Sequence, residues 1–327
     1  MIRRQNAPVT SRPAPGLLAV GFALFVLYVV WGSTYLAISY AIETIPPLLG
    51  AGGRFLLAGG VLFGFLGLRG ALRGERIDAR TWRSAAIVGI ALLVGGNGLV
   101  VLAEQTIPSG ITALLVATVP IWMAFFESVV SRRRPSLLVL GGLAAGFIGV
   151  AMLVAPAGAA QLDIAGMALG LASPICWAAG SVYARRTVLP SSPFVTTAME
   201  MVVGGVTLLA LAGATGEVAR FDPGAASTES IVALGYLVLF GSLAGFTAYI
   251  WLLHNVSPTT ASTYAYVNPV VAIALGAWIR DEPIGPRTII AAAIIVAAVV
   301  AMVSGRFTQA APDSPPPKAA HRSITDA

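Results

Sequence analysis

The chain has 327 residues, of which 57% are hydrophobic and only 10% are charged. Soluble domains carry about a quarter charged residues, so this composition, with a mean hydropathy of +0.85, excludes a soluble globular protein and indicates an integral membrane protein. The net charge of +6 is interpreted through membrane topology, and no nucleic-acid partner is expected. The single cysteine, Cys176, and two distant histidines predict neither a disulfide framework nor a metal site.

Ten apolar stretches follow one another along the chain, each close to the ~20 residues that a helix needs to cross a bilayer. The sequence therefore predicts an all-α integral membrane protein with ten transmembrane helices, at residues 17–38, 48–68, 85–103, 110–130, 137–155, 165–184, 194–214, 231–253, 260–279 and 288–304. The first stretch is too long for a signal-peptide core. Residues 1–16 are expected to form a cytoplasmic N-terminal segment, and the Pro-, Ala- and Ser-rich residues 305–327 a disordered cytoplasmic tail.

Lysine and arginine are spread unevenly over the connections between these helices. With the N-terminus inside, the inner segments hold sixteen of the 20 basic residues and the outer loops hold three, while Arg54 lies within a span. Positive residues accumulate on the cytoplasmic side of a membrane, so both termini are predicted to be cytoplasmic. Because all but one of these residues are arginine, a bias that hints at a GC-rich bacterial genome, the expected location is a bacterial inner membrane.

The two halves of the chain share several residues at a nearly constant spacing. Pro120 and Pro269 are 149 residues apart, and Arg54 and Glu200 are 146 apart. We therefore predict two five-helix repeats, at residues 17–155 and 156–304. Because each repeat has an odd number of spans, the second enters the membrane from the opposite side, and the repeats are inverted. Inverted repeats provide the geometry that alternating access needs.

Two of the predicted spans are interrupted by proline near their middle. Pro120 and Pro269 have no N–H, so the carbonyls of Val116 and Ala265 lose their helical partners. Hydrocarbon tolerates this only where the freed group is buried in protein or lines a wet cavity. Two broken spans at matched positions indicate the binding site of a transporter, with the second break at Asn268-Pro269. The alternative is a pair of tolerated kinks with only a packing role.

Five motifs occur in order on successive predicted helices: WGSTYLAI (31–38), GRFLLAG (53–59), AEQTIPSGITALLVATVP (103–120), NVSPTTASTYAYVNPVVA (255–272) and DEP (281–283). With these motifs the sequence resembles the EamA-type branch of the drug/metabolite transporter superfamily over about residues 17–305. The resemblance implies a ten-helix metabolite transporter, without naming a solute. The first repeat departs from the pattern, because Arg132–Arg134 stand where the second has Asp281-Glu282.

Charged residues inside a membrane are costly and should face an interior or find a partner. Arg54 and Glu200 occupy equivalent positions in the two repeats, and each lies about 9 Å along the helix axis from the start of its own helix. The two helices start on opposite faces of the membrane. A core about 30 Å thick then leaves about 12 Å between them. We therefore expect two separate gating or coupling roles, although structural hydrogen bonding or snorkelling would explain both residues equally well.

Two further polar residues lie on the third predicted helix. Asn97 interrupts a glycine-rich stretch, and its amide is either a helix–helix bond or a cavity donor. Glu104, at the outer end, could receive a proton in an antiport cycle, although solvation alone would explain it. Glu127, near the inner end of the fourth helix, is expected to be solvated or paired with Arg132–Arg134.

Aromatic residues recur at mid-depth, whereas aromatic belts belong at the membrane interfaces. Trp177 and Tyr264 lie midway along their spans, and Trp31 lies between Tyr28 and Tyr35 on one face of the first helix. These rings form either a cavity wall or ordinary bundle packing. The candidate solute-binding residues are Trp31, Asn97, Pro120, Trp177, Ser242, Tyr264, Asn268 and Pro269. Helices five and ten hold almost nothing polar and are expected to face lipid as scaffold.

Together these features predict a secondary transporter of small organic metabolites that works by alternating access, with amino acids or related compounds as the expected cargo and net export as the expected direction. No G-x-x-x-x-G-K-[ST] loop is present, and no cofactor is expected. An intramembrane enzyme would need catalytic groups that converge at one depth; a receptor or assembly subunit is the third alternative. The expected partners are a small-molecule solute, the lipid bilayer and a candidate coupling proton, with the chain a monomer or a weak homodimer.

Overall fold

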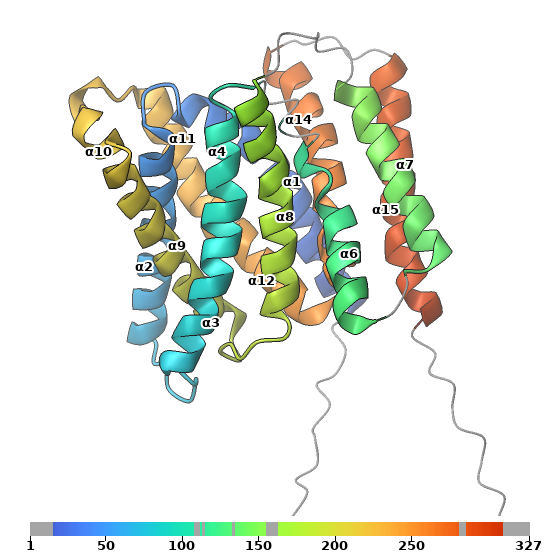
Figure 1. Cartoon of the computed structure of the whole chain (residues 1–327), viewed down its shortest axis with the longest axis horizontal. Coiled ribbons are helices and arrows are strands. Elements are labelled where there is room, and N and C mark those ends of the chain that lie inside the picture. The colour runs from blue at the N-terminus through green and yellow to red at the C-terminus, as the bar shows by residue number, and fades with distance from the viewer. Residues whose placement is uncertain are drawn as a thin grey trace, which may run out of the picture.

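The computed structural model describes residues 16–107, 112, 115–132, 135–154, 163–280 and 286–309. Within these ranges the chain is helical, with turns between the helices and no strand. The helices run side by side along a common direction (Figure 1). Six helical runs are long and apolar enough to cross a membrane, and three shorter helices are also apolar. The predicted all-α membrane fold is confirmed.

The first half of the chain begins with α1 (Leu17–Ala41) and α2 (Pro47–Leu68). A third run consists of α3 (Ala79–Gly89), the π-helix η1 (Ile90–Gly98) and α4 (Leu99–Ala103). Next come α6 (Val119–Ser131) and α7 (Leu137–Val154). The expected N-terminal segment lies outside the described residues, except for Gly16.

The second half begins with α8 (Ile164–Ala184) and α9 (Pro193–Ala214), followed by the short α10 (Glu217–Arg220) and the 3-10 helix η2 (Pro223–Ala225). A third run consists of α11 (Thr228–Tyr236), the π-helix η3 (Leu237–Phe246) and α12 (Thr247–Asn255). The half ends with α13 (Pro258–Ala261), α14 (Tyr264–Arg280) and α15 (Pro286–Gln309). The Asp281–Pro283 motif and residues 310–327 lie outside the described part of the chain.

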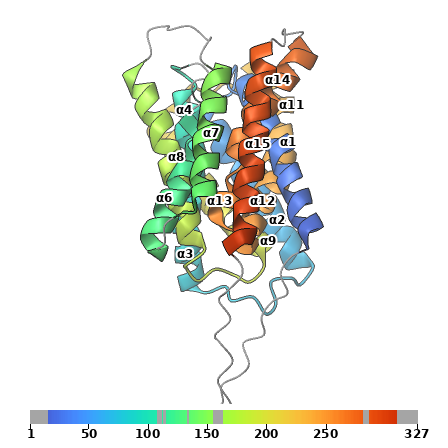
Figure 2. The same cartoon turned by 90° about the vertical axis from the view of Figure 1, so that its right-hand side faces the viewer.

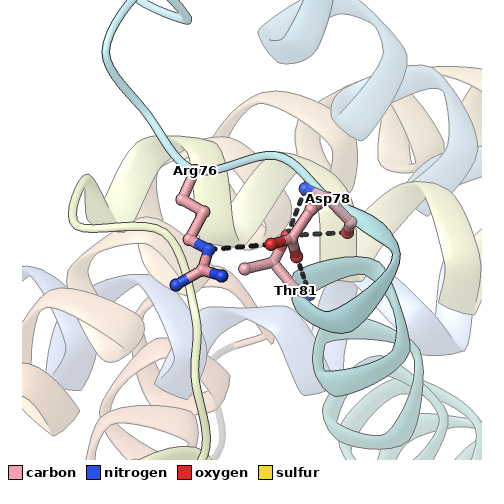
Figure 3. Close-up of polar contacts among 3 residues, drawn as sticks. All are labelled: Arg76, Asp78 and Thr81. Atoms are coloured by element: carbon pink, nitrogen blue, oxygen red, sulfur yellow. Dashed lines mark hydrogen bonds and ion pairs between the residues drawn. The ribbon is translucent and has the colours of Figure 1, made fainter.

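Several helix ends differ from the predicted ones, and the structure gives a physical reason for two of the starts. The third run begins at Ala79, six residues before the expected start, because Asp78 caps it: its carboxylate accepts from the Thr81 N–H at 2.9 Å, and the Thr81 hydroxyl accepts from the Asp78 N–H at 2.9 Å (Figure 3). Such a capping box satisfies backbone groups that a helix end otherwise leaves unpaired. Ser227 caps α11 in the same way by accepting from the Ser230 N–H. Helix α15 continues to Gln309, beyond the expected end at residue 304.

The first and last described helices place both chain ends at one end of the bundle. Helix α1 begins and α15 ends there, and we call this the lower end; α1 ends and α2 begins at the opposite, upper end (Figures 1 and 2). The loop between α2 and α3, with Arg69, Arg73 and Arg76, lies at the lower end. Arg220, on α10, lies at the upper end. The side of the membrane that each end faces remains a prediction from the sequence.

Helices α7 and α15 lie together at one side of the bundle (Figure 1). They approach closely, because a Cβ added to Gly142 would meet the Met302 side chain at 2.6 Å. Their other faces stay exposed, as at Leu137, Ile148 and Val300. This arrangement fits the expectation that these two helices are scaffold facing lipid.

Candidate functional site

A cavity in the middle of the bundle brings together six of the residues that the sequence singled out. It has about 660 Å³ of space free of protein atoms, its open mouth included. The singled-out residues that line it are Trp31, Arg54, Asn97, Trp177, Tyr264 and Asn268. Further lining residues that sequence reasoning did not select include Thr34, Phe55, Gly96 and Ser173. Because this volume counts the open mouth, it is an upper limit on the size of a bound solute.

Five other candidates do not line this cavity. Pro120, Ser242 and Pro269 are buried in the packing around it. Glu104 and Glu200, predicted as gating or coupling residues, also lie off the cavity wall. The prolines are therefore part of the helices around the cavity and not among its lining residues, and their contact with a solute stays a prediction.

The second helix break lies elsewhere than predicted. Pro269 is inside α14, and the break falls at Ser262–Thr263, between α13 and α14. The hydroxyls of Ser262 and Thr263 donate to carbonyls three residues back, at 2.9 Å in both cases. Because such bonds compete with the helical ladder, they favour a break there, while proline removes only one bond and the helix continues through it.

The first break lies close to its predicted place. The turn Ala117–Thr118 precedes α6, and Pro120 occupies the first turn of that helix, where its missing N–H leaves no bond unmade. The Thr118 hydroxyl donates to the Leu115 carbonyl at 2.6 Å. Hydroxyl groups bonded three residues back are thus common to both breaks. The Thr- and Ser-rich sequence before Pro269 was a signal for the second break.

Four aromatic rings pack together at the lower side of the cavity. Trp31, Trp177 and Tyr264 line the cavity, with Trp31 the lining residue of α1 nearest that helix's lower start, and Tyr249 contacts all three rings. The Trp31 ring centroid lies 4.7 Å from that of Tyr264, 5.3 Å from Tyr249 and 5.5 Å from Trp177. Three of the contacts, Trp31–Trp177, Trp31–Tyr264 and Tyr249–Tyr264, are edge-to-face, a favoured arrangement of aromatic pairs. We call Trp31, Trp177, Tyr249 and Tyr264 the aromatic floor. Its members come from α1, α8, α12 and α14, and thus from both halves of the chain.

Hydrogen bonds hold the aromatic floor in place. The Trp177 Nε1–H donates to the Tyr249 Oη at 2.7 Å, and the Ser181 Oγ lies 2.5 Å from the same oxygen. The Trp31 Nε1–H donates to the Gly241 carbonyl at 3.0 Å. Below the rings, the Tyr28 Oη and the Thr263 Oγ1 lie 2.7 Å apart and join α1 to the turn before α14. Each indole in the floor therefore has its N–H satisfied, which fixes its rotamer.

Two glycines at repeat-equivalent positions make room for the two indoles. Gly96 lies in η1 and Gly245 in η3, and these are the π-helical segments of the two halves. A Cβ added to Gly96 would collide with the Trp177 ring, and one added to Gly245 would collide with the Trp31 ring. Each half thus receives a tryptophan from the other half. Gly96 and Gly245 are 149 residues apart, the same spacing as Pro120 and Pro269. The π-helices, which often mark functional sites, have no such signal in the sequence.

Arg54 enters the cavity from α2 with only 6% of its surface exposed. Its Nη2–H donates to the Asn97 Oδ1 at 3.1 Å, and its Cζ lies 4.2 Å from the Phe55 ring centroid. Its Nε is buried and has no hydrogen-bond partner among the described residues. Asn97 thus joins η1 to α2 through its amide oxygen and also lines the cavity, and its predicted role as a donor in the cavity stays a prediction.

Glu200 lies lower, in a different environment. Helices α2 and α9 pack antiparallel, because added Cβ atoms would bring Gly52 against Leu209 and Gly205 against Leu56. In this register Arg54 lies at the height of Thr207. Thr207 is seven residues from Glu200, so Arg54 and Glu200 are about 10 Å apart along the helix axis. The Glu200 side chain is fully buried, and neither carboxyl oxygen has a hydrogen-bond partner among the described residues.

The other two acids of interest lie nearer the bundle ends. Glu104 ends α4 at the upper end, and its Oε1 is buried without a partner within the described chain. Glu127, on α6, pairs with Arg186 Nη2 at 3.3 Å. The sequence placed Arg132–Arg134 beside Glu127, but Arg133 and Arg134 lie outside the described residues.

Two further hollows lie between the cavity and the upper end. The first shares Ile38 and Arg54 with the cavity and reaches Ile45 and Pro47. The second shares Pro47 with the first and extends to Arg220 on α10. On the lower side the aromatic floor fills the corresponding space. The cavity therefore has its open side toward the upper end and its closed side toward the lower end.

These features define a multi-pass membrane protein with a central, one-sided cavity between two related halves. The model of the EamA-like transporter family matches residues 18–155 and 164–304, and the chain belongs to this family. The family resemblance predicted from the motifs is confirmed. The chain is a membrane transporter and not an enzyme.

Individual relatives are named as transporters too. The chain is 41% identical over 293 residues to the "uncharacterized inner membrane transporter YedA" of Escherichia coli K12, covering 89% of this chain and 92% of the relative. It is 27% identical over 285 residues to the "S-adenosylmethionine/S-adenosylhomocysteine transporter" of Chlamydia trachomatis serovar L2, covering 84% and 86%. A crystal structure with 18% identity superposes with a TM-score of 0.72, covering 88% of this chain and 99% of the other. That likeness shows the fold alone.

Proposed function

We propose that this chain is a secondary transporter that moves small organic metabolites across the bacterial inner membrane by alternating access. The observation that carries this proposal is the central cavity, which has hollows leading to the upper end and an aromatic floor on the lower side. A solute that enters from the upper end meets polar groups at mid-membrane and stops at the floor. Release on the other side then requires the floor to part.

The internal repeat supports this mechanism. Trp177 packs against Gly96 of the first half, and Trp31 packs against Gly245 of the second half. These two contacts are related by the repeat, and one can be tighter than the other in a given conformational state. If the halves rock against one another, the floor opens while the upper hollows close. The five-helix repeats are inverted and both termini are cytoplasmic in this proposal. The pseudo-symmetry of the chain then relates the state that is open on one side of the membrane to the state that is open on the other.

We further propose amino acids or related compounds as cargo, with net export. The cavity offers an aromatic surface together with the side chains of Arg54, Asn97 and Asn268, and the Asn268 Oδ1 is buried without a partner among the described residues. An amino acid has an apolar body and polar groups that suit such a mixed surface. A relative named for S-adenosylmethionine transport carries a solute with an amino-acid end, which supports the same class.

Glu200 is our candidate for proton coupling. A buried carboxylate without a partner is costly, so a dry carboxyl is best accommodated with a proton. Among the titratable groups of the helices that pack on α9, Tyr249 is buried on α12, Arg54 lies about 10 Å away along the helix axis, and Arg80 and Arg83 are exposed. His254, Glu217 and Arg220 lie on α12 and α10. Opening of the lower side would let water reach Glu200 and release the proton.

Counterflow into liposomes that contain the purified protein tests the transport proposal. A panel of amino acids and nucleosides inside the vesicles should drive accumulation of at least one labelled counterpart. Trp177→Ala is expected to lower the rate at least ten-fold because it opens the floor, whereas Trp278→Ala, an 80% exposed tryptophan on α14, should leave it unchanged. Absence of counterflow for the whole panel, from protein that unfolds cooperatively, would contradict the proposal.

A further inference from the structure

The cavity carries an unbalanced positive charge. Among its lining residues Arg54 is the charged one, and no acidic side chain is among them. Arg54 makes no ion pair within the described chain, where the pairs are Arg76–Asp78 and Arg186–Glu127. Glu104 is not among the residues that line the cavity. A buried cation left without a counter-charge is unfavourable, unless a ligand supplies one.

The Arg54 guanidinium is held in place by its neighbours, while its Nε–H group remains available to a ligand. Asn97 takes one Nη2–H at 3.1 Å, and the Phe55 ring supports the flat face at 4.2 Å. The Nε–H, on the same planar group, has no partner within the described residues. A guanidinium presents its N–H groups in a rigid fork that matches the two oxygens of a carboxylate. Asn97 and Phe55 thus orient the fork before any solute arrives.

The opposite side of the cavity is apolar and flat. Trp31, Trp177 and Tyr264 present rings there, while Arg54 stands where the cavity meets the hollow toward the upper end. A solute that uses both sides has a negatively charged group at one end and an apolar or flat body at the other. A cation would face Arg54 without an acidic partner on the wall, so repulsion would disfavour it.

We infer that Arg54 is the anion-recognition residue of this transporter and that its solute bears a carboxylate attached to a small organic body. The inference rests on the proposed transport function and narrows its substrate class to organic anions and zwitterions. Arg54 is thereby assigned to solute binding, whereas the sequence had suggested gating or coupling. Asn97 acts as a positioning residue, because it reaches the solute through Arg54.

A binding experiment with charge-matched probes tests this assignment. The probes are the N-acetyl derivatives of L-leucine, L-phenylalanine and L-methionine, each as the free acid and as the uncharged carboxamide. Binding to purified full-length protein is followed by intrinsic tryptophan fluorescence, since Trp31 and Trp177 line the cavity. The expected result is that at least one acid binds at least ten-fold more tightly than its amide.

Variants separate the role of Arg54 from a structural one. Arg54→Gln should weaken binding of that acid at least ten-fold, as expected for loss of a charge-assisted bond, and should leave the amide unchanged; Arg54→Lys should recover part of the loss. Arg69→Gln is the matched control, because Arg69 also stacks on a phenylalanine, with its Cζ 5.1 Å from the Phe65 centroid, but is exposed outside the cavity. Thermal unfolding of each variant checks that it is folded.

The outcomes also distinguish this inference from the proposed function. Equal binding of acids and amides, or an equal loss of both in Arg54→Gln, would overturn the assignment of Arg54. Counterflow of cationic or uncharged solutes without binding of any acid would overturn it while leaving the transporter intact. If folded protein shows neither counterflow nor binding, the proposed transport function is contradicted. The assignment of Arg54 to anion recognition, which rests on that function, is then contradicted as well.

Discussion

Arg54 and Glu200 stand at equivalent positions of the two repeats, yet their surroundings differ completely. Arg54 lines a cavity, is bonded to Asn97 and lies beside a hollow that leads upward. Glu200 is fully buried, and its carboxyl oxygens have no partner within the described chain. The difference teaches that the charge nearer the upper end lies in the wall of a cavity, while the charge nearer the lower end is enclosed by packed side chains.

The same comparison shows what the two halves keep in common. Each has a π-helix in its third helical run and a glycine, Gly96 or Gly245, that holds a tryptophan of the other half. Shared backbone features thus frame the site on both sides. The chemistry differs because the side chains at corresponding positions differ. Arg54 corresponds to Glu200, and Asn97 in the third helical run of the first half corresponds to Phe246 in that of the second.

The largest expected effect comes from reversing the two charges. Arg54→Glu and Glu200→Arg should each abolish transport, because a charge of the wrong sign is then buried at a place without a partner for it. The double variant should be equally inactive, since about 10 Å along the axis separates the two positions. Counterflow in liposomes is the measurement. Recovery of transport in the double variant would show that the two side chains pair during the cycle.

The next effect tests the helix pair that carries both charges. A Cβ added to Gly59 would meet the Met201 Cβ at 2.7 Å and the backbone N of Val202 at 2.8 Å. Gly59→Ala should therefore force α2 and α9 apart and lower the free energy of unfolding by about 1–3 kcal/mol, the usual cost of overpacking. Gly60→Ala is the control on the same helix, because nothing lies within 4 Å of the added Cβ. Equal thermal stabilities in detergent would mean that the crossing is looser than described.

A smaller effect is expected at the far wall of the cavity. Asn268 has an unpartnered Oδ1 among the described residues, and Tyr264 belongs to the aromatic floor. Asn268→Ala and Tyr264→Ala should each raise the half-saturating solute concentration by roughly two- to twelve-fold, which corresponds to a lost hydrogen bond of about 0.5–1.5 kcal/mol. Near-normal expression and thermal stability should accompany this change. Unfolding of both variants with unchanged affinity in the folded fraction would make them packing residues only.

The smallest effect lies outside the membrane, at the start of α3. The Thr81 backbone N–H and the Arg76 guanidinium, which is 2.7 Å from the carboxylate, hold the pKa of Asp78 below its ordinary value. Asp78 therefore adds stability above the ordinary carboxyl pKa, and this contribution is lost as the pH falls through the lowered pKa. The thermal stability of Asp78→Asn should depend less on acidification than that of the wild type. Identical pH profiles would show that the cap does not affect global unfolding.

The fold was largely predictable because hydrophobic length and charge asymmetry are properties of the sequence itself. Helix positions and the internal repeat followed from them. The exact starts at Ala79 and Thr228 were missed, since polar caps lie outside the apolar stretches that were counted. The break at Ser262–Thr263 was misplaced because proline is the more visible signal. The hydroxyl bonds that favour the break depend on the local backbone.

The site was predictable only in part. Residues unusual for a membrane interior, such as Trp177, Arg54 and Asn268, were found because their burial there needs a reason. The partnership of Arg54 with Asn97 and the exchange of tryptophans between the halves were not predictable, because both depend on how distant helices pack. Tyr249 was not among the predicted site residues, and its role in the aromatic floor appears only with its contacts to Trp31 and Trp177.

The most direct test of alternating access is the reactivity of two single cysteines in a Cys176→Ala background. Ile38→Cys reports on the upper side, because Ile38 lines both the cavity and the hollow above it. Thr197→Cys reports on the lower side, because Thr197 is buried on α9 one turn before Glu200 and its hydroxyl has no partner within the described residues. Labelling by a membrane-impermeant thiol reagent is followed from each side while a transported solute is added. The account predicts that one reactivity rises as the other falls; changes of the same sign at both positions, or no change at either, would contradict it.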